Sequence, residues 1–323
     1  MENIVIDSLL AANNTITNPV VKRLNCRLLV FLIIMNNQEK MNINTDKSVA
    51  IITGSSAGIG LQTSLLLARN GFDTYAGVRN LEKSKVIEDI ARDENLSLQL
   101  LQLDVDSDES VSNSIGKVIV ERKKVDVLIN NAGYGLLGAL EELSMNNIKA
   151  QFETNFFGAI RCIKEIIPVM RQQRSGIIVN ISSQAGYIGF PVCSVYDSTK
   201  FALEGLIESM TYEVEPYGIK MVLIEPGCIN SDFLNRLVIS NNTQDSKSPY
   251  FDMFKKFTAN YFKAMNNAPP PEAVAKVILE TITSTNPLLR YQIGEDAETI
   301  FKAKKEMTDE NIHKLMAGAV LKA

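Results

Sequence analysis

The 323-residue sequence contains a single histidine, His313, close to its C-terminus. This scarcity argues against a Ser-His-Asp hydrolase, a histidine-rich zinc site and a dehydrogenase whose chemistry depends on histidine. We expect His313 itself to be a surface residue of a helix. Acid–base chemistry near neutral pH would then come from a tyrosine, a lysine or a carboxylate whose pKa has been shifted by its surroundings.

Paired cysteines and basic clusters are also missing. The four cysteines, Cys26, Cys162, Cys193 and Cys228, are scattered and include no C-x-x-C spacing. They predict reduced thiols in a cytoplasmic protein, with neither a disulfide framework nor a metal site. The net charge is −4 and no dense run of lysine and arginine occurs, which argues against nucleic acid as the main partner.

No apolar run near the N-terminus is long enough to span a bilayer, which needs about 20 residues; the run at 28–35 is too short. Residues 1–45 nevertheless differ from the rest of the chain, and three interpretations stay open. They could be a secretory signal, although no small-residue cleavage site follows Met35. They could be a flexible or membrane-touching extension. We favour a third reading, in which translation starts at Met35 or Met41 and the upstream residues are not native.

From residue 46 to 323 the sequence alternates short apolar runs with helical segments. The predicted strands are Val49–Thr53, Thr74–Val78, Leu98–Leu103, Val125–Ile129, Ile177–Ile181, Lys220–Ile224 and Leu288–Ile293. The predicted helices include Leu61–Ala68, Ser107–Lys123, Ile148–Arg171 and Val195–Glu215. Nearly continuous apolar strands between helices indicate an α/β fold, a doubly wound, Rossmann-like parallel sheet with helices on both faces. We expect one domain, with ligands at the carboxyl ends of the strands.

A glycine-rich turn follows the first predicted strand directly. Thr53–Gly60 reads T-G-S-S-A-G-I-G, and a helical segment begins immediately after it. Gly54 permits a tight turn, while Gly58 and Gly60 let backbone and helix approach a pyrophosphate. A strand, a glycine turn and a helix in this order direct the positive end of a helix at a phosphate group. The segment therefore predicts nucleotide binding, although a purely structural turn is the alternative.

Tyr196 and Lys200 are four residues apart and would share one face of a helix. The phenol has an ordinary pKa of about 10, and a neighbouring ammonium group favours its ionised form. We therefore expect Lys200 to lower the pKa of Tyr196 toward neutrality. Ser182 and Ser183 end an apolar run upstream. Together with the glycine turn, these residues indicate an enzyme that moves a hydride to or from a nicotinamide.

The whole set of motifs resembles the short-chain dehydrogenases/reductases, in their single-domain branch, over residues 47–294. Thr53–Gly60 is similar to the family's T-G-x-x-x-G-x-G turn, and residues 130–133 to its N-N-A-G element. Residues 225–227, E-P-G, resemble the turn after the sixth strand. We expect these residues to contact the cofactor: Thr53, Gly54, Ser55, Ser56, Gly58, Ile59, Gly60, Arg79, Asp104, Val105, Asn131, Ala132, Gly133, Tyr196, Lys200, Pro226, Gly227 and Ile229.

The resemblance also implies catalytic roles. Ser183, thirteen residues before Tyr196, would polarise the carbonyl oxygen, and Tyr196 would act as general acid/base; Ser182 is the less favoured serine. Lys200 would tune Tyr196 and hydrogen-bond the nicotinamide ribose. Asn155 would hold a water molecule behind Lys200. Each residue also has an ordinary structural alternative: a solvated helix pair, a strand-end turn residue or a helix cap.

The end of the second predicted strand indicates which cofactor is used. An acidic residue there would accept hydrogen bonds from a ribose 2′-hydroxyl and select NAD. Val78 occupies that place and Arg79 follows, and a guanidinium suits a 2′-phosphate. The sequence therefore favours NADP(H) over NAD(H), unless Arg79 merely points into solvent.

Residues 228–268 follow the sixth predicted strand and should form a substrate lid. Large apolar side chains are dense in this segment: Phe233, Leu234, Leu237, Tyr250, Phe251, Phe254, Phe257, Tyr261 and Phe262. They could cover a hydrophobic substrate, or pack the lid onto the domain or a second subunit. Residues 241–249 are polar and predict a mobile loop. The stretch Tyr196–Leu206 resembles family members that act on steroids, retinoids and other hydrophobic alcohols.

These observations favour an NADP(H)-dependent oxidoreductase that interconverts a carbonyl and an alcohol on a hydrophobic small molecule. One alternative is a catalytically inactive nucleotide sensor or scaffold of the same fold. A second is an epimerase or dehydratase, although such relatives generally carry another glycine spacing and a larger C-terminal domain. The predicted helices at 155–170 and from Val195 commonly pair subunits in the family, so a homodimer or homotetramer is expected.

Overall fold

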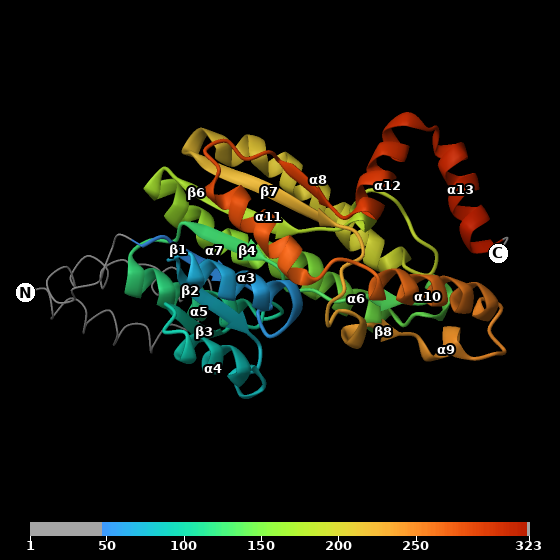
Figure 1. The fold of residues 1–323 in the computed structure, drawn as a ribbon, viewed down its shortest axis with the longest axis horizontal. Helices are drawn as coiled ribbons and strands as arrows, with labels where there is room; N and C mark the ends of the chain where they lie inside the picture. Colours follow the sequence, from blue (N-terminus) through green and yellow to red (C-terminus); the bar gives the residue numbers. More distant parts are fainter. Residues whose placement is uncertain (1–46, 322–323) are drawn as a thin grey trace, which may run out of the picture.

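The computed structural model describes residues 47–321, and their centre is a seven-stranded parallel sheet with the strand order β3-β2-β1-β4-β6-β7-β9 (Figure 1). The three interpretations of residues 1–45 concern a part of the chain that lies outside the described residues. The strands are β1 (Val49–Ile52), β2 (Asp73–Val78), β3 (Leu98–Gln102), β4 (Val127–Asn130), β6 (Gly176–Ile181), β7 (Ile219–Pro226) and β9 (Arg290–Ile293). The order reverses between β1 and β4, which confirms the predicted doubly wound sheet.

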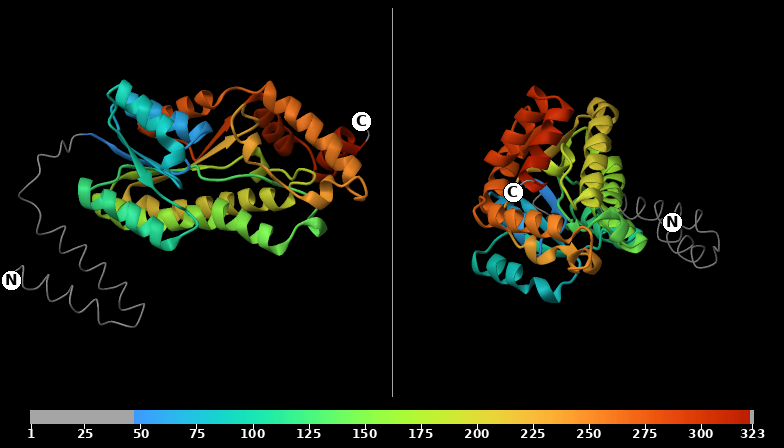
Figure 2. Two further views of the ribbon diagram at one scale, coloured as in Figure 1. Left: turned by 90° about the horizontal axis from the view of Figure 1, so that it is seen from below. Right: turned by 90° about the vertical axis from the view of Figure 1, so that its right-hand side faces the viewer.

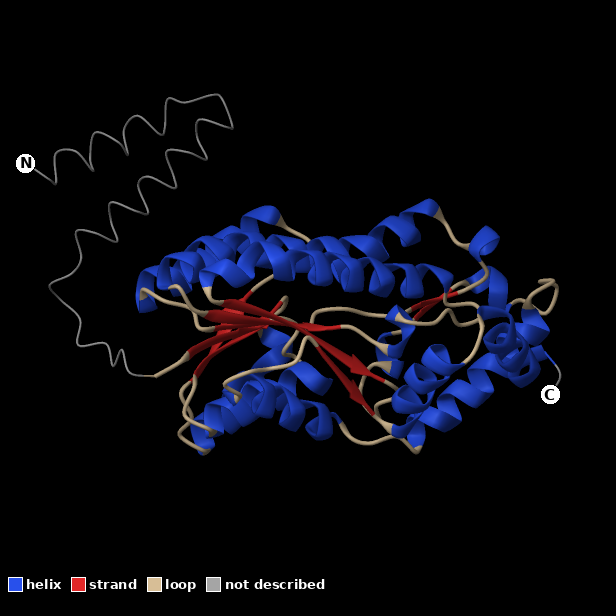
Figure 3. Cartoon of the chain, turned by 90° about the horizontal axis from the view of Figure 1, so that it is seen from above, coloured by secondary structure: helices blue, strands red, loops and turns tan. Residues whose placement is uncertain are grey.

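Helices cover both faces of this sheet, so its strands carry apolar side chains on both sides. Helices are seen above and below the sheet in Figure 3. On one face lie α5 (Asp108–Arg122), α7 (Gly158–Gln173) and α8 (Ser194–Val214), whose buried side chains form one continuous cluster with those of the sheet. On the other lie α3 (Gly58–Arg69) and α11 (Pro271–Thr283), with α4 (Lys85–Asp93) beside them. Burial on both faces explains the near-continuous apolar runs of the sequence.

Several boundaries differ from the predicted ones for local reasons. β4 begins at Val127 because the Gln173 side chain hydrogen-bonds both the N–H and the carbonyl of Val125. The helix predicted at 148–171 is α6 (Met145–Phe152), a π-helical turn at Glu153–Phe157, and then α7. Such turns insert an extra residue and frequently occur at functional sites. This one contains Asn155.

The predicted lid segment is largely structured. It contains a 3₁₀ turn (Leu234–Arg236), β8 (Val238–Ile239), α9 (Asn241–Gln244) and α10 (Phe251–Asn266). β8 pairs in parallel with β5 (Leu136–Leu137), which ties the lid to the body of the protein. The segment predicted as a mobile loop begins with α9, because the Ser240 hydroxyl caps this helix by accepting from the N–H of Thr243.

Two further helices, α12 (Glu295–Glu306) and α13 (Asp309–Leu321), follow β9; a helix was expected only around His313, and no bounds were predicted for either. They lie at the carboxyl end of the sheet, and α13 contacts α10 of the lid (Figures 1 and 2). His313 is exposed on α13, as expected. Within residues 47–321, no helix has the length and apolar character needed to cross a membrane.

Candidate active site

A deep cleft of about 1370 Å³ opens at the carboxyl ends of the strands, where the order of the sheet reverses. Its wall runs from the glycine turn after β1, past the ends of β2, β3 and β4, to the lid and α13. Ligands of doubly wound sheets bind at this position. The residues that line the cleft form two halves. A nucleotide half lies at the ends of β1–β3, and a second half lies under the lid.

The glycine turn shapes the nucleotide half. Gly54 and Gly58 have φ angles of +69° and +58°, a region that side chains rarely adopt. A Cβ on Gly54 would lie 2.8 Å from the Ala132 Cα, so only glycine fits against the chain after β4. The helix α3 then starts at Gly58 with no side-chain cap and no acidic residue in its first turn. Its free N–H groups and positive end suit a phosphate.

Thr53 and Asn131 hold this turn in place. The Thr53 hydroxyl accepts hydrogen bonds of 3.0 Å from the main-chain N–H groups of Asn131 and Ala132. The Asn131 amide donates to the main-chain oxygens of Thr53, at 2.9 Å, and Gly54, at 3.1 Å. The two motifs therefore lock the ends of β1 and β4 together.

Fifteen of the eighteen predicted cofactor residues line the cleft, and three do not. Those on its wall are Gly54, Ser56, Gly58, Ile59, Arg79, Asp104, Val105, Asn131, Ala132, Gly133, Tyr196, Lys200, Pro226, Gly227 and Ile229. Thr53 lies behind the wall. Ser55 is turned inward, where its hydroxyl donates to the Ile52 oxygen and accepts from Ser64. Gly60 packs against the Asn131 side chain: a Cβ on Gly60 would lie only 2.4 Å from Asn131 Nδ2.

Arg79 lies at the edge of the nucleotide half. It directly follows β2, is exposed and lines the cleft, whereas Val78 is buried and leaves no acid at the strand end. Asp106 faces Arg79 across this edge. Burial raises the pKa of the Asp106 carboxyl, while a hydrogen bond from Thr154 and the charge of Arg79 lower it. Asp106 was not predicted as a site residue, because its position depends on how the segment after β3 folds back.

Tyr196, Ser183 and Lys200 meet in the middle of the cleft. Ser183 follows β6, accepts a hydrogen bond of 3.1 Å from the N–H of Ala185, and hydrogen-bonds Tyr196. Tyr196 and Lys200 share the inner face of α8, with the Lys200 Nζ 5.7 Å from the centre of the tyrosine ring. Lys200 donates a hydrogen bond of 2.8 Å to the Ile181 oxygen. The strand end and the helix together fix all three side chains.

Burial dominates the acid–base properties of this group. It raises the pKa of Tyr196, and the hydrogen bond with Ser183 lowers that pKa by less. It also lowers the pKa of Lys200 to about 8, against the opposing effect of the Glu204 charge. We predicted that Lys200 lowers the pKa of Tyr196, but the net shift has the opposite sign. The phenolate is disfavoured because the ring is enclosed by the lid.

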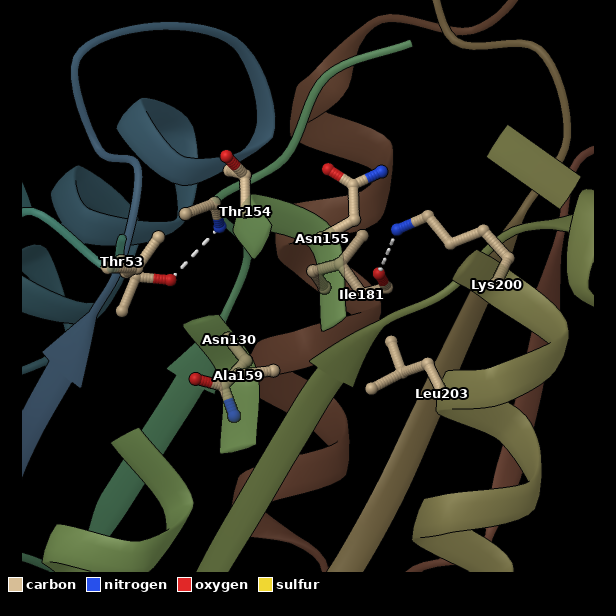
Figure 4. A pocket seen from close by; sticks show the side chains of 10 residues that line it. Thr53, Asn130, Thr154, Asn155, Ala159, Ile181, Lys200 and Leu203 are labelled. Carbon is tan, nitrogen blue, oxygen red and sulfur yellow. Dashed lines mark hydrogen bonds between the residues drawn. The ribbon is translucent and has the colours of Figure 1, made fainter. Parts of the chain in front are cut away.

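Asn155 borders a small cavity behind Lys200. Its side-chain oxygen accepts from the N–H of Tyr134 at 3.1 Å, and its amide donates to the Tyr134 oxygen at 3.0 Å. The cavity has a volume of about 10 Å³, and in Figure 4 Lys200 and Asn155 reach toward it from two sides. The buried side-chain oxygen of Asn130, which also lines it, has no hydrogen-bond partner among the described residues. This space matches one water molecule with polar neighbours.

The second half of the cleft is mostly apolar. Phe190, Phe233, Leu237, Phe257, Tyr261, Met265, Ile300 and Met316 line it. Phe257 and Phe254 are also buried in a cluster with Leu137, so the lid aromatics both pack the lid and face the cleft. Asp296 of α12 accepts from the N–H of Cys228 at 2.7 Å and lines the wall. Asp296 and Met316 were missed because the sequence did not predict that the C-terminal helices border the cleft.

Within residues 47–321, no group of three or more histidine, cysteine, aspartate or glutamate side chains is arranged to hold a metal ion. Cys162, Cys193 and Cys228 are free thiols, and burial raises the pKa of each. Cys26 lies outside the described residues.

The model of the short chain dehydrogenase family matches residues 48–241, more than half of the chain. The protein belongs to the short-chain dehydrogenase/reductase family and is an oxidoreductase of that family. The 3-ketodihydrosphingosine reductase of Bacteroides thetaiotaomicron is 33% identical to it over 264 residues, covering 82% of this chain and 94% of that protein. Retinol dehydrogenase 8 of Bos taurus is 37% identical over 249 residues, covering 74% and 79%.

Solved structures show the same fold. A short-chain dehydrogenase from Streptomyces avermitilis superposes with a TM-score of 0.73 at 26% identity, covering 87% of this chain and 98% of that one. ElxO with NADP bound superposes with a TM-score of 0.63 at 31% identity, covering 76% and 96%. The family and the fold predicted from the sequence are therefore confirmed.

Proposed function

We propose that this oxidoreductase uses NADP(H) to interconvert a carbonyl and an alcohol on a hydrophobic small molecule. The observation that carries the proposal is the meeting of Ser183, Tyr196 and Lys200 where the nucleotide half of the cleft joins the apolar half. A nucleotide sensor or scaffold would need no half-buried phenol between a serine and a lysine at that junction. We infer that residues 46–323 work as one catalytic domain with residues 228–268 as its lid.

The glycine turn and the uncapped start of α3 would hold the cofactor phosphates, and Pro226, Gly227 and Ile229 would border the nicotinamide. NADPH, when bound, supplies the hydride. The Ser183 hydroxyl would donate a hydrogen bond to the substrate oxygen and so favour the charge that develops there. Tyr196, kept protonated by burial, would give its proton to that oxygen. A phenol that is protonated at neutral pH can act as the proton donor in the reductive direction.

Lys200 would stabilise the phenolate left on Tyr196 and hydrogen-bond the nicotinamide ribose. The small cavity between Lys200 and Asn155 would hold a water molecule that returns a proton toward Tyr196. Asn155 would act by shaping this cavity, since its side chain is hydrogen-bonded to Tyr134.

The preference for NADP(H) rests on Arg79. A guanidinium at the cleft edge, with no acidic residue at the end of β2, suits a ribose 2′-phosphate. The solved relative ElxO binds NADP. The Asp106 carboxyl opposite Arg79 would help to orient the guanidinium.

The apolar half of the cleft supports a hydrophobic substrate. Aromatic and aliphatic side chains from the lid and α13 line this half, as is typical of sites for apolar ligands. Relatives named for ketodihydrosphingosine, retinol and hydroxysteroid substrates act on molecules of this kind. We propose a long-chain or polycyclic ketone, aldehyde or secondary alcohol.

The expected homodimer or homotetramer would use the outer surface of α7 and α8. Phe201 and Tyr212 on α8 are exposed, as is Phe157 immediately before α7. Exposed aromatic side chains on adjacent helices suit a subunit contact. Light scattering on a sizing column would measure the mass of the oligomer.

We also propose a cytoplasmic location, in keeping with the three free thiols among the described residues.

A cofactor titration tests the proposal. NADPH and NADH fluorescence would be titrated with the full chain and with Arg79→Asp, using Arg92→Asp on the exposed side of α4 as the control. We expect NADPH to bind at least about tenfold more tightly than NADH, and Arg79→Asp alone to lose this preference. Equal binding of both cofactors by the wild type would refute the preference for NADP(H). Binding of neither would refute the enzymatic proposal.

A further inference from the structure

Two buried carboxyl groups face each other behind the cleft, outside the set of residues discussed so far. Glu204 lies on α8 one turn after Lys200 and is 7% exposed. Glu225 lies near the end of β7 and is 0% exposed. Both carboxyl groups reach the same atom, Arg290 Nε, so they are close neighbours. Carboxylates are almost never buried unless a partner compensates their charge.

Arg290 of β9 is the partner that the two carboxyl groups share. Its Nε lies 3.1 Å from Glu204 Oε2 and 3.3 Å from Glu225 Oε1, and its Nη2 lies 2.6 Å from Glu208 Oε2. Gln292 of the same strand donates a hydrogen bond to Glu225 Oε2. Three carboxyl groups therefore surround one guanidinium, which cannot balance them if all three are ionised.

A single proton resolves this imbalance. The Oε1 atoms of Glu204 and Glu225 are both buried without a hydrogen-bond partner among the atoms of the described residues, as expected where the missing partner is a proton on one carboxyl group. With Glu225 protonated, the cations Lys200 and Arg290 balance the anions Glu204 and Glu208. Glu225 is the more deeply buried, and burial together with the charge of Glu204 raises its pKa to about 8.

The pair lies directly beside the catalytic group. Glu204 Cγ and Ser182 Oγ each lie 2.9 Å from the position that a Cβ on Gly186 would take, and Ser182 follows Ile181, whose oxygen accepts from Lys200. The charged groups that face the pair are Lys200 and Glu208 from α8 and Arg290 from β9, whereas Ser182 and Gln292 are neutral. Glu204 is the anion whose charge acts on Lys200. Lys200 is itself only 7% exposed and has lost the water that would stabilise its ammonium.

We propose that Glu204 is a positioning residue that keeps the buried Lys200 charged, and that protonated Glu225 and Arg290 hold Glu204 in place. A neutral Lys200 could not stabilise a phenolate on Tyr196. For its catalytic meaning this inference rests on the proposed function, but the charge of Lys200 can be measured without turnover.

The experiment follows the Nζ signal of Lys200 by NMR against pH, in the full chain with isotope-labelled lysine. Loss of the signal in Lys200→Arg assigns it. We expect Glu204→Gln to lower the pH midpoint of Lys200 by at least about one unit, the shift typical of losing a nearby opposite charge. Glu204→Asp, which keeps the charge, should bring the midpoint most of the way back to its wild-type value. Glu208→Gln is the matched control, because the exposed Glu208 carboxylate pairs with the same Arg290, and it should leave the midpoint of Lys200 unchanged.

Glu225→Gln tests which carboxyl group holds the proton. Glutamine has the shape of a protonated glutamate and can donate to Glu204, so the midpoint of Lys200 should stay at its wild-type value. An unshifted midpoint in Glu204→Gln, or an equal fall in Glu225→Gln, would overturn the inference. A wild-type midpoint below pH 7 would overturn it even if Glu204→Gln does not fold. If the shifts appear but no carbonyl is reduced, the proposed function fails and the assignment of the pair stands.

Discussion

The Lys200 ammonium donates a hydrogen bond of 2.8 Å to the main-chain oxygen of Ile181, at the end of β6. This bond ties the centre of α8 to the strand that precedes Ser183. It places the cation 5.7 Å from the centre of the Tyr196 ring and away from bulk water. Helix and strand therefore position the serine, the tyrosine and the lysine through main-chain contacts that the substrate need not supply.

Asn155 is expected to stabilise the wall of the cleft through Tyr134. Asn155→Leu removes the acceptor of the Tyr134 N–H, whereas the Tyr134 oxygen still accepts from Gln151 at 2.8 Å. One unsatisfied buried donor costs about 1–3 kcal/mol. Urea unfolding should show a loss of this size. Asn146→Ala, at an exposed position of α6, should change stability by less than about 0.5 kcal/mol, and an equal loss in both variants would contradict the role of Asn155.

Asp197 is expected to make stability depend on pH. Burial raises its pKa from 3.8 to about 8, so between these values the folded protein binds a proton that the unfolded chain has released. Stability from this group is therefore full at low pH and is lost as pH rises toward about 8, by at most about 1.4 kcal/mol per pH unit. Denaturation at several pH values should show a flatter slope for Asp197→Asn.

The control for this pH experiment is Asp89→Asn, on the exposed surface of α4. It should keep the wild-type slope. Glu225 contributes a slope of the same sign, so Asp197→Asn should flatten the dependence without abolishing it. A slope unchanged by Asp197→Asn would show that the carboxyl group is ionised in the folded protein.

Gly60 and Gly116 are expected to respond in opposite directions to replacement by alanine. A Cβ on Gly60 would lie 2.4 Å from the Asn131 Nδ2 and 2.5 Å from the Gly54 oxygen, so the locked turn would have to shift. Overpacking of this kind costs about 1–3 kcal/mol. Gly116 on α5 has nothing within 4 Å of its Cβ position, and alanine there should add about 0.5–1 kcal/mol. Thermal melts of the two variants compare them directly, and a stabilised Gly60→Ala would contradict the packing argument.

The sequence predicted the fold and the centre of the site because both follow from local patterns. Tyr196 and Lys200 are one helical turn apart, and the glycine turn follows a strand directly. Both features can therefore be predicted without knowing which distant residues they contact. Features set by distant contacts were missed or misjudged. The direction of the Tyr196 pKa shift depends on burial under the lid. Asp296 lines the cleft from α12 and accepts a hydrogen bond from Gln184, which is 112 residues earlier in the sequence.

Ser55 shows a different limit. Its place in the glycine turn indicated a cofactor contact, but the rotation of the chain after β1 directs its hydroxyl to Ile52 and Ser64. Ser56, the next residue, faces the cleft and accepts a hydrogen bond of 3.3 Å from Arg236 of the lid. The motif identifies the turn, whereas the direction of each side chain follows from the backbone geometry.

The most direct test of the central claim is the NADPH-dependent reduction of long-chain and polycyclic ketones and aldehydes by wild type, Tyr196→Phe and Tyr212→Phe. Tyr212 lies on the same helix but is 75% exposed, so it is a matched control. We expect turnover of at least one hydrophobic carbonyl, a fall of about 10²–10⁴-fold in Tyr196→Phe with NADPH binding retained, and no change in Tyr212→Phe. Wild-type turnover by Tyr196→Phe would contradict the claim that Tyr196 supplies the proton.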